Sequence, residues 1–242
     1  MIERAVTCFL SSGSTLEVLI NRYRKISYSI DDYGLRLVIN MHLDGTEDFE
    51  RIYSYLVSEM GCFFLKAGRL SSSGYLLKAL KEENKKIVLA ESCTGGMVAK
   101  MITDIPGSSN FFLGSFVTYS NDAKAKMLGI SPNAIERFGA VSRETVENML
   151  SGALNRSNAD IALAVSGIAG PGGGSKTKPV GTVWIGVMKA GDDSQYVYRM
   201  VFEGDRNTVR QKSAVSAMLI AETVIKNHES LDNHGNWQYN EK

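Results

Sequence analysis

A short turn at residues 91–96, with two hydroxyls and two glycines, has residue types that could do chemistry. It follows an apolar run expected to form a strand (86–90) and precedes an expected helix (95–104). Ser92 and Thr94 would then lie at the C-terminal edge of a sheet, where open α/β sheets bind ligands. Gly95 and Gly96 permit close backbone approach, and amides at a helix start can bind an anion. The same residues also fit a simple helix cap, so spacing alone leaves both interpretations open.

A glycine-rich loop at 166–174 follows another expected strand. Its five glycines expose backbone amides that could hold a phosphate. The loop is not a Walker A motif, because Ser175 stands where a glycine must precede Lys176 and Thr177. The competing interpretation is a flexible connection to the next strand.

Two basic side chains lie near expected helix starts. Lys124 falls in the first turn of a helix expected over 121–128, where the helix dipole disfavours a cation and lowers its proton affinity. That would suit a general base, although a solvated surface lysine fits the spacing as well. Arg206, at the start of the last helix, could pair with a phosphate or simply lie on the surface.

Strands and helices alternate over residues 75–226, which predicts an α/β domain with a partly parallel sheet covered by helices. We expect further strands at 112–119, 160–166, 180–188 and 195–202, and helices at 75–83, 142–155 and from Asp205 to about 226. Ser142 and Asp205 are the expected helix caps.

The first part of the chain, residues 1–72, reads as a small α+β domain, with alternating strand spacing over 35–43 and helical spacing over 46–60. A Ser-Ser-Ser-Gly run at 71–74 is the expected linker to the second domain, 73–226. The polar residues 227–242 are expected to form a disordered tail.

The composition excludes some classes of protein. With 27 Lys plus Arg against 26 Asp plus Glu, the 242-residue chain has no electrostatic case for binding nucleic acid or an acidic membrane. No apolar run approaches the roughly 18–20 residues of a membrane span, and the N-terminus does not fit a signal peptide.

Cysteines and histidines are few and scattered. The three cysteines, Cys8, Cys62 and Cys93, predict neither disulfides nor a metal site, and fit a reducing cytoplasm. A Ser–His–Asp hydrolase would depend on His42, in a strand pattern of the other domain, because the remaining histidines fall in the polar tail.

Seven ordered blocks together resemble one known family. They are A-E-S-C-T-G-G (90–96), D-I-P-G-S-S-N-F-F-L-G-S (104–115), Y-S-N-x-A-K (119–124), G-A-V-S (139–142), S-G-I-A-G-P-G-G-G (166–174), K-P-V-G-T-V (178–183) and F-x-G-D-R-x-x-V-R (202–210). The chain over 73–226 resembles the C-terminal domain family of the competence/damage-inducible protein CinA, the nicotinamide mononucleotide amidohydrolases. Ser166 departs from the family's usual threonine but keeps the hydroxyl.

The resemblance implies hydrolysis of the carboxamide of nicotinamide mononucleotide, without metal or cofactor, by a serine and a lysine. Ser92 would be the nucleophile, Lys124 its base and Tyr119 a support for the pair. The oxyanion would be held by amides around Thr94, Gly95 and Gly96. The nucleotide, and its phosphate above all, would be bound by Asn121, Ser166, Gly167, Ala169, Gly170, Gly172, Gly173 and Arg206. The family also implies a homodimer.

Residues 1–72 resemble, more weakly, the KH-like domain that precedes this domain in longer CinA proteins, through Y-G-L-R-L at 33–37. The segment has eight Lys or Arg against nine Asp or Glu and no G-x-x-G loop, so we expect a structural or assembly role rather than RNA binding.

Two alternatives stay open. A nucleotide-binding module without turnover would need neither Ser92 nor Lys124 to be reactive. A thiol hydrolase would use Cys93, although alternate pointing of adjacent side chains would keep Cys93 and Ser92 from facing the ligand together. The biological role, pyridine-nucleotide salvage or a process tied to competence, is not readable from the residues.

Overall fold

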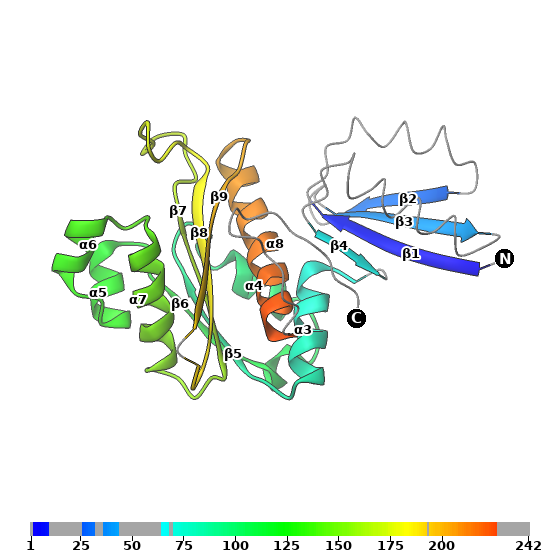
Figure 1. Cartoon of the computed structure of the whole chain (residues 1–242), viewed down its shortest axis with the longest axis horizontal. Coiled ribbons are helices and arrows are strands. Elements are labelled where there is room, and N and C mark those ends of the chain that lie inside the picture. Colours follow the sequence, from blue (N-terminus) through cyan, green and yellow to red (C-terminus); the bar gives the residue numbers. More distant parts are fainter. Residues whose placement is uncertain are drawn as a thin grey trace. The chain divides into compact units, whose positions relative to one another are not determined.

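The computed structural model of the chain divides into two units, Met1–Ser71 and Ser72–Lys242, drawn in Figure 1. It describes residues 70–192 and 194–226 in full, and the backbone of four strands in the first unit. The predicted helix over 46–60 and the predicted tail over 227–242 lie outside the described residues.

The strands of the first unit form one antiparallel sheet of order β2-β3-β1-β4. They are β1 (Ile2–Phe9), β2 (Ile26–Asp31), β3 (Arg36–Leu43) and β4 (Phe64–Ala67). The alternating pattern over 35–43 is confirmed as β3. The KH-like assignment of this unit stays a prediction.

A five-stranded mixed sheet organises the second unit, with the order β6-β5-β7-β8-β9. Its strands are β5 (Ile87–Glu91), β6 (Phe112–Val117), β7 (Ile161–Gly167), β8 (Thr182–Lys189) and β9 (Gln195–Val201). β6, β5 and β7 run parallel, whereas β8 and β9 are antiparallel to their neighbours. β5 and β7 are continuous apolar runs because helices cover both of their faces. The predicted α/β fold with a partly parallel sheet is confirmed.

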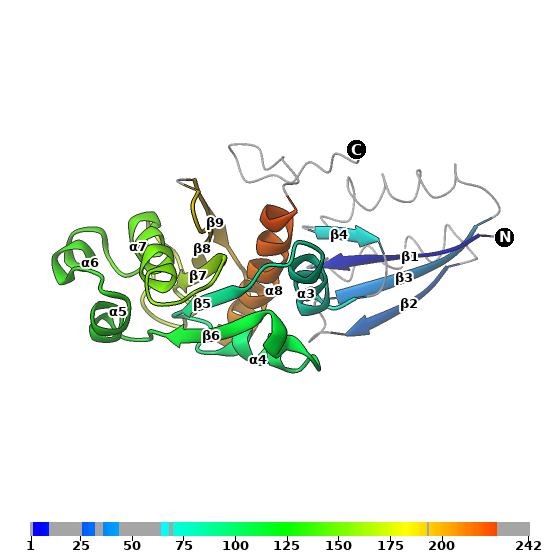
Figure 2. The same ribbon diagram turned by 90° about the horizontal axis from the view of Figure 1, so that it is seen from below.

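Helices lie on both sides of this sheet (Figures 1 and 2). One side carries α3 (Ser72–Glu82), α4 (Met97–Thr103) and α8 (Arg206–Ile225). The other carries α5 (Asn121–Leu128), α6 (Pro132–Phe138) and α7 (Arg143–Leu154). A core cluster of apolar side chains lies between this second group of helices and the sheet. It includes Val146 and Leu150 of α7 and Ala162 and Ala164 of β7.

The helix starts follow local side-chain chemistry. The side chains of Ser142 and Asp205 accept hydrogen bonds from amides in the first turns of α7 and α8, which confirms both predicted caps. α4 begins at Met97 rather than at the predicted residue 95, because Gly95 and Gly96 have φ of +58° and +89°, outside the helical region.

Within the described residues, none of the helices combines the length and apolar character needed to cross a bilayer. For the site, the main consequence of the fold is that the carboxyl ends of β6, β5 and β7 meet at one edge of the sheet. The segments that follow these strands therefore come together there.

Candidate active site

Ser92 is held by the sheet itself. It follows β5 directly, and its amide donates to the Val165 carbonyl oxygen of β7 (2.9 Å). On the other side, the Thr118 amide donates to the Glu91 carbonyl oxygen (2.8 Å). Ser92 is only 8% exposed, so both its backbone and its side chain are fixed.

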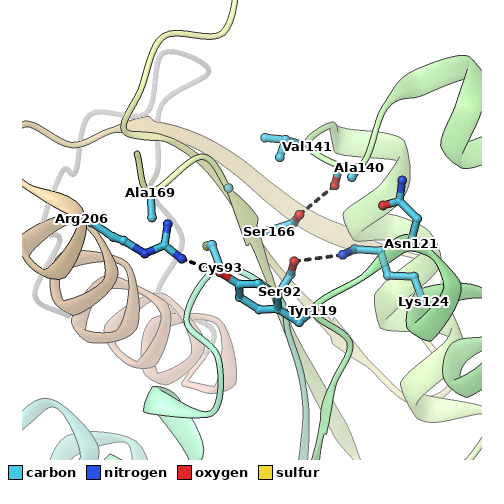
Figure 3. A pocket seen from close by; sticks show the side chains of 11 residues that line it. Ser92, Cys93, Tyr119, Asn121, Lys124, Ala140, Val141, Ser166, Ala169 and Arg206 are labelled. Carbon is cyan, nitrogen blue, oxygen red and sulfur yellow. Dashed lines mark hydrogen bonds between the residues drawn. The ribbon is translucent and has the colours of Figure 1, made fainter. Parts of the chain in front are cut away.

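Lys124 reaches Ser92 from the first turn of α5. Its Nζ donates to Ser92 Oγ (2.9 Å) and to the Thr118 carbonyl oxygen (2.9 Å). The side chain is 1% exposed, and α5 is anchored at its start by Ser120, whose hydroxyl accepts from the Ala123 amide. Figure 3 shows the hydroxyl and the amine pointing toward one another. The Ser92 hydroxyl and the Lys124 amine are therefore in contact, as expected from the sequence. The alternative that Lys124 is a solvated surface lysine is wrong, because its side chain is buried.

Burial sets the charge preference of this amine. Removal from water lowers the pKa of Lys124 below its usual range, because it disfavours the ammonium form. Among the described residues, no carboxylate forms an ion pair with Lys124 to oppose that effect. The lowered pKa makes the neutral form of this amine, which lies within hydrogen-bonding distance of a buried hydroxyl, easier to reach than in an exposed lysine.

A cavity of about 220 Å³ opens onto the pair at the carboxyl edge of the sheet (Figure 3). Its lining comes from the ends of the parallel strands, from the first turns of α5 and α8, and from the segment before α7. The lining residues are Ser92, Cys93, Tyr119, Asn121, Lys124, Ala140, Val141, Ser166, Gly167, Ala169 and Arg206.

Cys93 lines the cavity together with Ser92, so the expectation that only one of them would face it is wrong. Its thiol is 6% exposed, and burial raises its pKa to about 12. A thiol with that pKa stays protonated at neutral pH, which argues against Cys93 as a nucleophile.

Ser166 places a second hydroxyl in the cavity, at the end of the neighbouring strand. The register of β5 and β7 pairs Glu91 with Val165, so Ser166 lies beside Ser92. The Ser166 hydroxyl is buried and donates to the Ala140 carbonyl oxygen (2.7 Å). Because its proton is committed to that carbonyl, the oxygen can only accept hydrogen bonds from a ligand.

Arg206 and Tyr119 meet at the rim. The guanidinium donates through Nη1 to the Gly170 carbonyl oxygen (2.7 Å) and through Nη2 to the Tyr119 hydroxyl. Tyr119 is 57% exposed and has no hydrogen bond to Ser92 or Lys124 among the described contacts. Tyr119 contacts Arg206 instead, and its predicted support of the pair stays a prediction.

Only part of the glycine loop lines the cavity. Gly167 and Ala169 do so, whereas Gly170 lies outside the lining and its carbonyl oxygen accepts from Arg206. Gly172 and Gly173 are exposed and also lie outside the lining. The phosphate role predicted for Gly170, Gly172 and Gly173 stays a prediction.

The turn after Ser92 also departs from the prediction. The Gly95 amide donates to the Ser92 carbonyl oxygen (3.0 Å), and the Gly96 amide donates to the Glu91 carboxylate (3.0 Å). Both amides are therefore occupied and cannot hold an oxyanion. Thr94 is fully buried and does not line the cavity, and its hydroxyl has no partner among the described residues.

Two residues with structural roles at this turn were not singled out from the sequence. The buried Glu91 carboxylate accepts from the amides of Gly96, Val98 and Ala99 and from the Ser115 hydroxyl, which anchors the start of α4. Arg210 donates to the carbonyl oxygens of Cys93 and Thr94. Arg210 ends the family-like block at 202–210, and its spacing of four from Arg206 places both on one face of α8.

No cluster of three His, Cys, Asp or Glu side chains that could hold a metal ion occurs in the part of the chain that the structure describes. The described side chains bring together a buried hydroxyl and a buried lysine amine, beside a cavity with an arginine at its rim.

Comparison with known proteins agrees with this fold. A family model described as the CinA C-terminal domain matches residues 71–225, and the chain belongs to this family. Two solved structures overlay on 64% of the chain: a CinA superfamily protein from Klebsiella pneumoniae (TM-score 0.62, 32% identity, 96% of that chain) and a competence/damage inducible protein from Agrobacterium tumefaciens (0.59, 38%, 99%).

Two kinds of curated relative match. A protein of Enterobacter agglomerans named nicotinamide-nucleotide amidohydrolase PncC is 50% identical over 151 residues, covering 62% of this chain and 91% of the relative. A CinA-like protein of Thermotoga neapolitana is 35% identical over 204 residues, 84% of this chain and 49% of the relative. The chain thus spans about half the length of the CinA-like relatives that it matches.

Proposed function

We propose that this protein hydrolyses the carboxamide of nicotinamide mononucleotide to nicotinate mononucleotide and ammonia, with Ser92 as nucleophile and Lys124 as base. The observation that carries the proposal is the 2.9 Å contact between Lys124 Nζ and Ser92 Oγ, facing a cavity. The name of the Enterobacter agglomerans relative supports the substrate class.

The reaction would proceed in two halves. Neutral Lys124 takes the Ser92 proton as Ser92 Oγ attacks the carboxamide carbon. The resulting ammonium then protonates the leaving nitrogen, so that ammonia departs and an acyl ester remains on Ser92. Lys124 next takes a proton from water, which attacks the ester, and returns that proton to Ser92 Oγ as the acid product leaves. In each half, Lys124 gains one proton and then gives it up, so that it ends in its neutral form.

The tetrahedral oxyanion needs hydrogen-bond donors beside Ser92. With the Gly95 and Gly96 amides occupied, we assign this role to the amide of Cys93, which lines the cavity and has no oxygen acceptor among the described residues. Thr94 is fully buried and outside the cavity lining, so its predicted oxyanion role stays a prediction.

The nucleotide part of the substrate would extend toward the rim. Arg206 supplies a cation with a planar donor fork, which suits a phosphate. Asn121, Gly167 and Ala169 also line the cavity and offer polar and backbone groups to a bound nucleotide. A role in pyridine-nucleotide salvage, a cytoplasmic location and a homodimeric assembly stay predictions, as does the absence of a cofactor.

Ser92→Ala tests the proposal. Loss of the nucleophile is expected to lower the rate of ammonia release from nicotinamide mononucleotide by at least roughly 10³-fold, with unchanged circular dichroism. Ser109→Ala, a matched change at an exposed serine, should keep the wild-type rate.

The other outcomes decide between the alternatives. Turnover that survives in Ser92→Ala but is lost in Cys93→Ser would make the thiol the nucleophile. Nucleotide binding without ammonia release by the wild-type protein would favour the non-catalytic module.

A further inference from the structure

The backbone amides around Ser92 can be assigned one by one to their acceptors. The Ser92 amide completes the β5–β7 ladder, and the Gly95 amide bonds back to the Ser92 carbonyl oxygen. The amides of Gly96, Val98 and Ala99 bond to the Glu91 carboxylate. Within the described part of the chain, this leaves the amides of Cys93 and Thr94 without an oxygen acceptor, directly after the nucleophile.

Hydrogen bonds to the carbonyl oxygens of Ser92 and Cys93 fix the orientation of these two amides, because each carbonyl shares a peptide unit with the following N–H. A trans peptide is planar, and its N–H points opposite to its C=O. The Ser92 carbonyl oxygen is held by the Gly95 amide, which directs the Cys93 N–H the other way. The Cys93 carbonyl oxygen accepts from Arg210 Nε (3.1 Å), which turns the Thr94 N–H away from α8.

Arg210 holds two consecutive carbonyl groups at once. Its Nη2 donates to the Thr94 carbonyl oxygen (2.7 Å), while Nε holds that of Cys93. The guanidinium is a rigid planar fork, so one group sets the Cys93–Thr94 and Thr94–Gly95 peptide units. The second unit carries the Gly95 amide, which holds the Ser92 carbonyl oxygen and thereby the Cys93 N–H. Arg210 does not line the cavity, so it can affect the reaction only through the turn.

We propose that Arg210 is a positioning residue that holds the turn after Ser92, so that the Cys93 amide serves as oxyanion donor. This inference rests on the proposed function. It predicts an effect on the transition state with little effect on substrate binding, because Arg210 is remote from the substrate but fixes the turn whose amide meets the developing charge.

The test compares Arg210→Ala, Arg210→Lys and the control Lys212→Gln. Lys212 lies on the same helix and donates to the Glu203 carbonyl oxygen, away from the turn. For Arg210→Ala, kcat should fall roughly 10²-fold, the scale of losing one oxyanion donor, while KM changes less than about 2-fold. Added guanidinium ion should restore part of kcat to Arg210→Ala and none to Ser92→Ala. Arg210→Lys should show a smaller loss, because an ammonium cannot hold both carbonyls in fork geometry.

A second measurement does not depend on the substrate. A fluorophosphonate probe forms a tetrahedral phosphonyl ester with a reactive serine and releases fluoride. Ser92 labelling should be slowed in both Arg210 variants and unchanged in Lys212→Gln. A different result is rapid labelling of the wild type and slow labelling of the Arg210 variants, although the wild type releases no ammonia from nicotinamide mononucleotide. That result would refute the substrate assignment and support the role of Arg210.

Three results would overturn the inference: unchanged kcat in Arg210→Lys and Arg210→Ala, a raised KM at constant kcat, or equal labelling rates in wild type and both Arg210 variants. If Arg210→Ala does not fold, Arg210→Lys and the labelling rate decide the matter.

Discussion

Among the described residues, the buried amine of Lys124 contacts two neutral oxygens, Ser92 Oγ and the Thr118 carbonyl oxygen. Burial therefore disfavours its charged form, and the pKa of the amine is lowered from its usual 10.5. The proposed reaction uses this lowering, because the unprotonated amine forms at a lower pH than in an exposed lysine.

The lowered pKa predicts the pH dependence of the reaction. Only the neutral amine can accept the Ser92 proton. We therefore expect kcat/KM to rise with pH, with a midpoint below 10.5, and to reach a plateau at higher pH. A pH–rate profile for ammonia release measures that midpoint. A rate that falls over this range, or is flat from pH 6 to 10, would contradict a lysine base.

The same titration has a consequence for stability. The pKa of Lys124 is lower in the folded than in the unfolded state, so the unfolded chain binds more protons between the two values. In that window, the unfolding free energy of the wild type should rise with pH relative to Lys124→Met, which removes the titrating amine. Urea unfolding of both proteins at several pH values measures the difference, which should stop growing above about pH 10.5.

Ser166 should discriminate the amide substrate from its acid product. Its oxygen can only accept, so it can bind the N–H of a carboxamide but is repelled by a carboxylate. Ser166→Ala is expected to lower kcat/KM by about 10- to 100-fold, as for a buried hydrogen bond lost, and to strengthen inhibition by the product. Ser166→Thr, which keeps the hydroxyl, should keep most of the activity. Unchanged product inhibition in Ser166→Ala would contradict this role.

At the scale of elements, the sequence was a good guide to strands and helices but not to the hydrogen bonds of the catalytic turn. Apolar runs such as β7 and caps such as Ser142 are local signals, so their elements could be predicted. The sheet order, with β5 between β6 and β7, depends on pairing between distant segments. The amides of Gly95 and Gly96 are occupied for two separate reasons. The Glu91 side chain reaches five residues ahead to Gly96, and the Gly95 amide turns back to the Ser92 carbonyl oxygen, and spacing reveals neither contact.

The tight approach of α5 and α7 fixes the helix that carries Lys124. A Cβ on Gly152 of α7 would lie 2.4 Å from the carbonyl oxygen of Leu128, at the end of α5. Gly152→Ala should therefore push α5 outward, destabilise the domain by about 1–3 kcal/mol and lower turnover by displacing Lys124. Denaturant unfolding and ammonia release measure both effects.

Asn148→Ala, on the exposed face of the same helix, serves as the control and should change neither quantity. If Gly152→Ala kept the wild-type stability and rate, α5 would be able to shift without moving the Lys124 amine, which would contradict this prediction.

At the scale of the whole molecule, the described catalytic parts all lie in one unit. The cavity lining runs from Ser92 to Arg206, inside the unit that begins at Ser72 and inside the family match at 71–225. The Enterobacter agglomerans relative, matched over 91% of its length, aligns with 62% of this chain. The fold thus locates the site without reference to residues 1–71.

A fragment of residues 72–226 should therefore fold and keep the Ser92-dependent rate within about 3-fold, since its core is formed by its own sheet and helices. Thermal unfolding and ammonia release, each compared with the full chain, test this expectation. A folded fragment without activity would show that residues 1–71 contribute to turnover.

The backbone of Ser92 is tied to the central sheet, with the β5–β7 ladder on one side and the Glu91–Thr118 contact on the other. Its amide should consequently exchange with deuterium as slowly as any in the domain, while amides of the exposed 171–177 loop exchange early. Ser92 should therefore stay in place until the sheet itself unfolds. Heat or denaturant should abolish turnover in the same cooperative transition that melts the sheet.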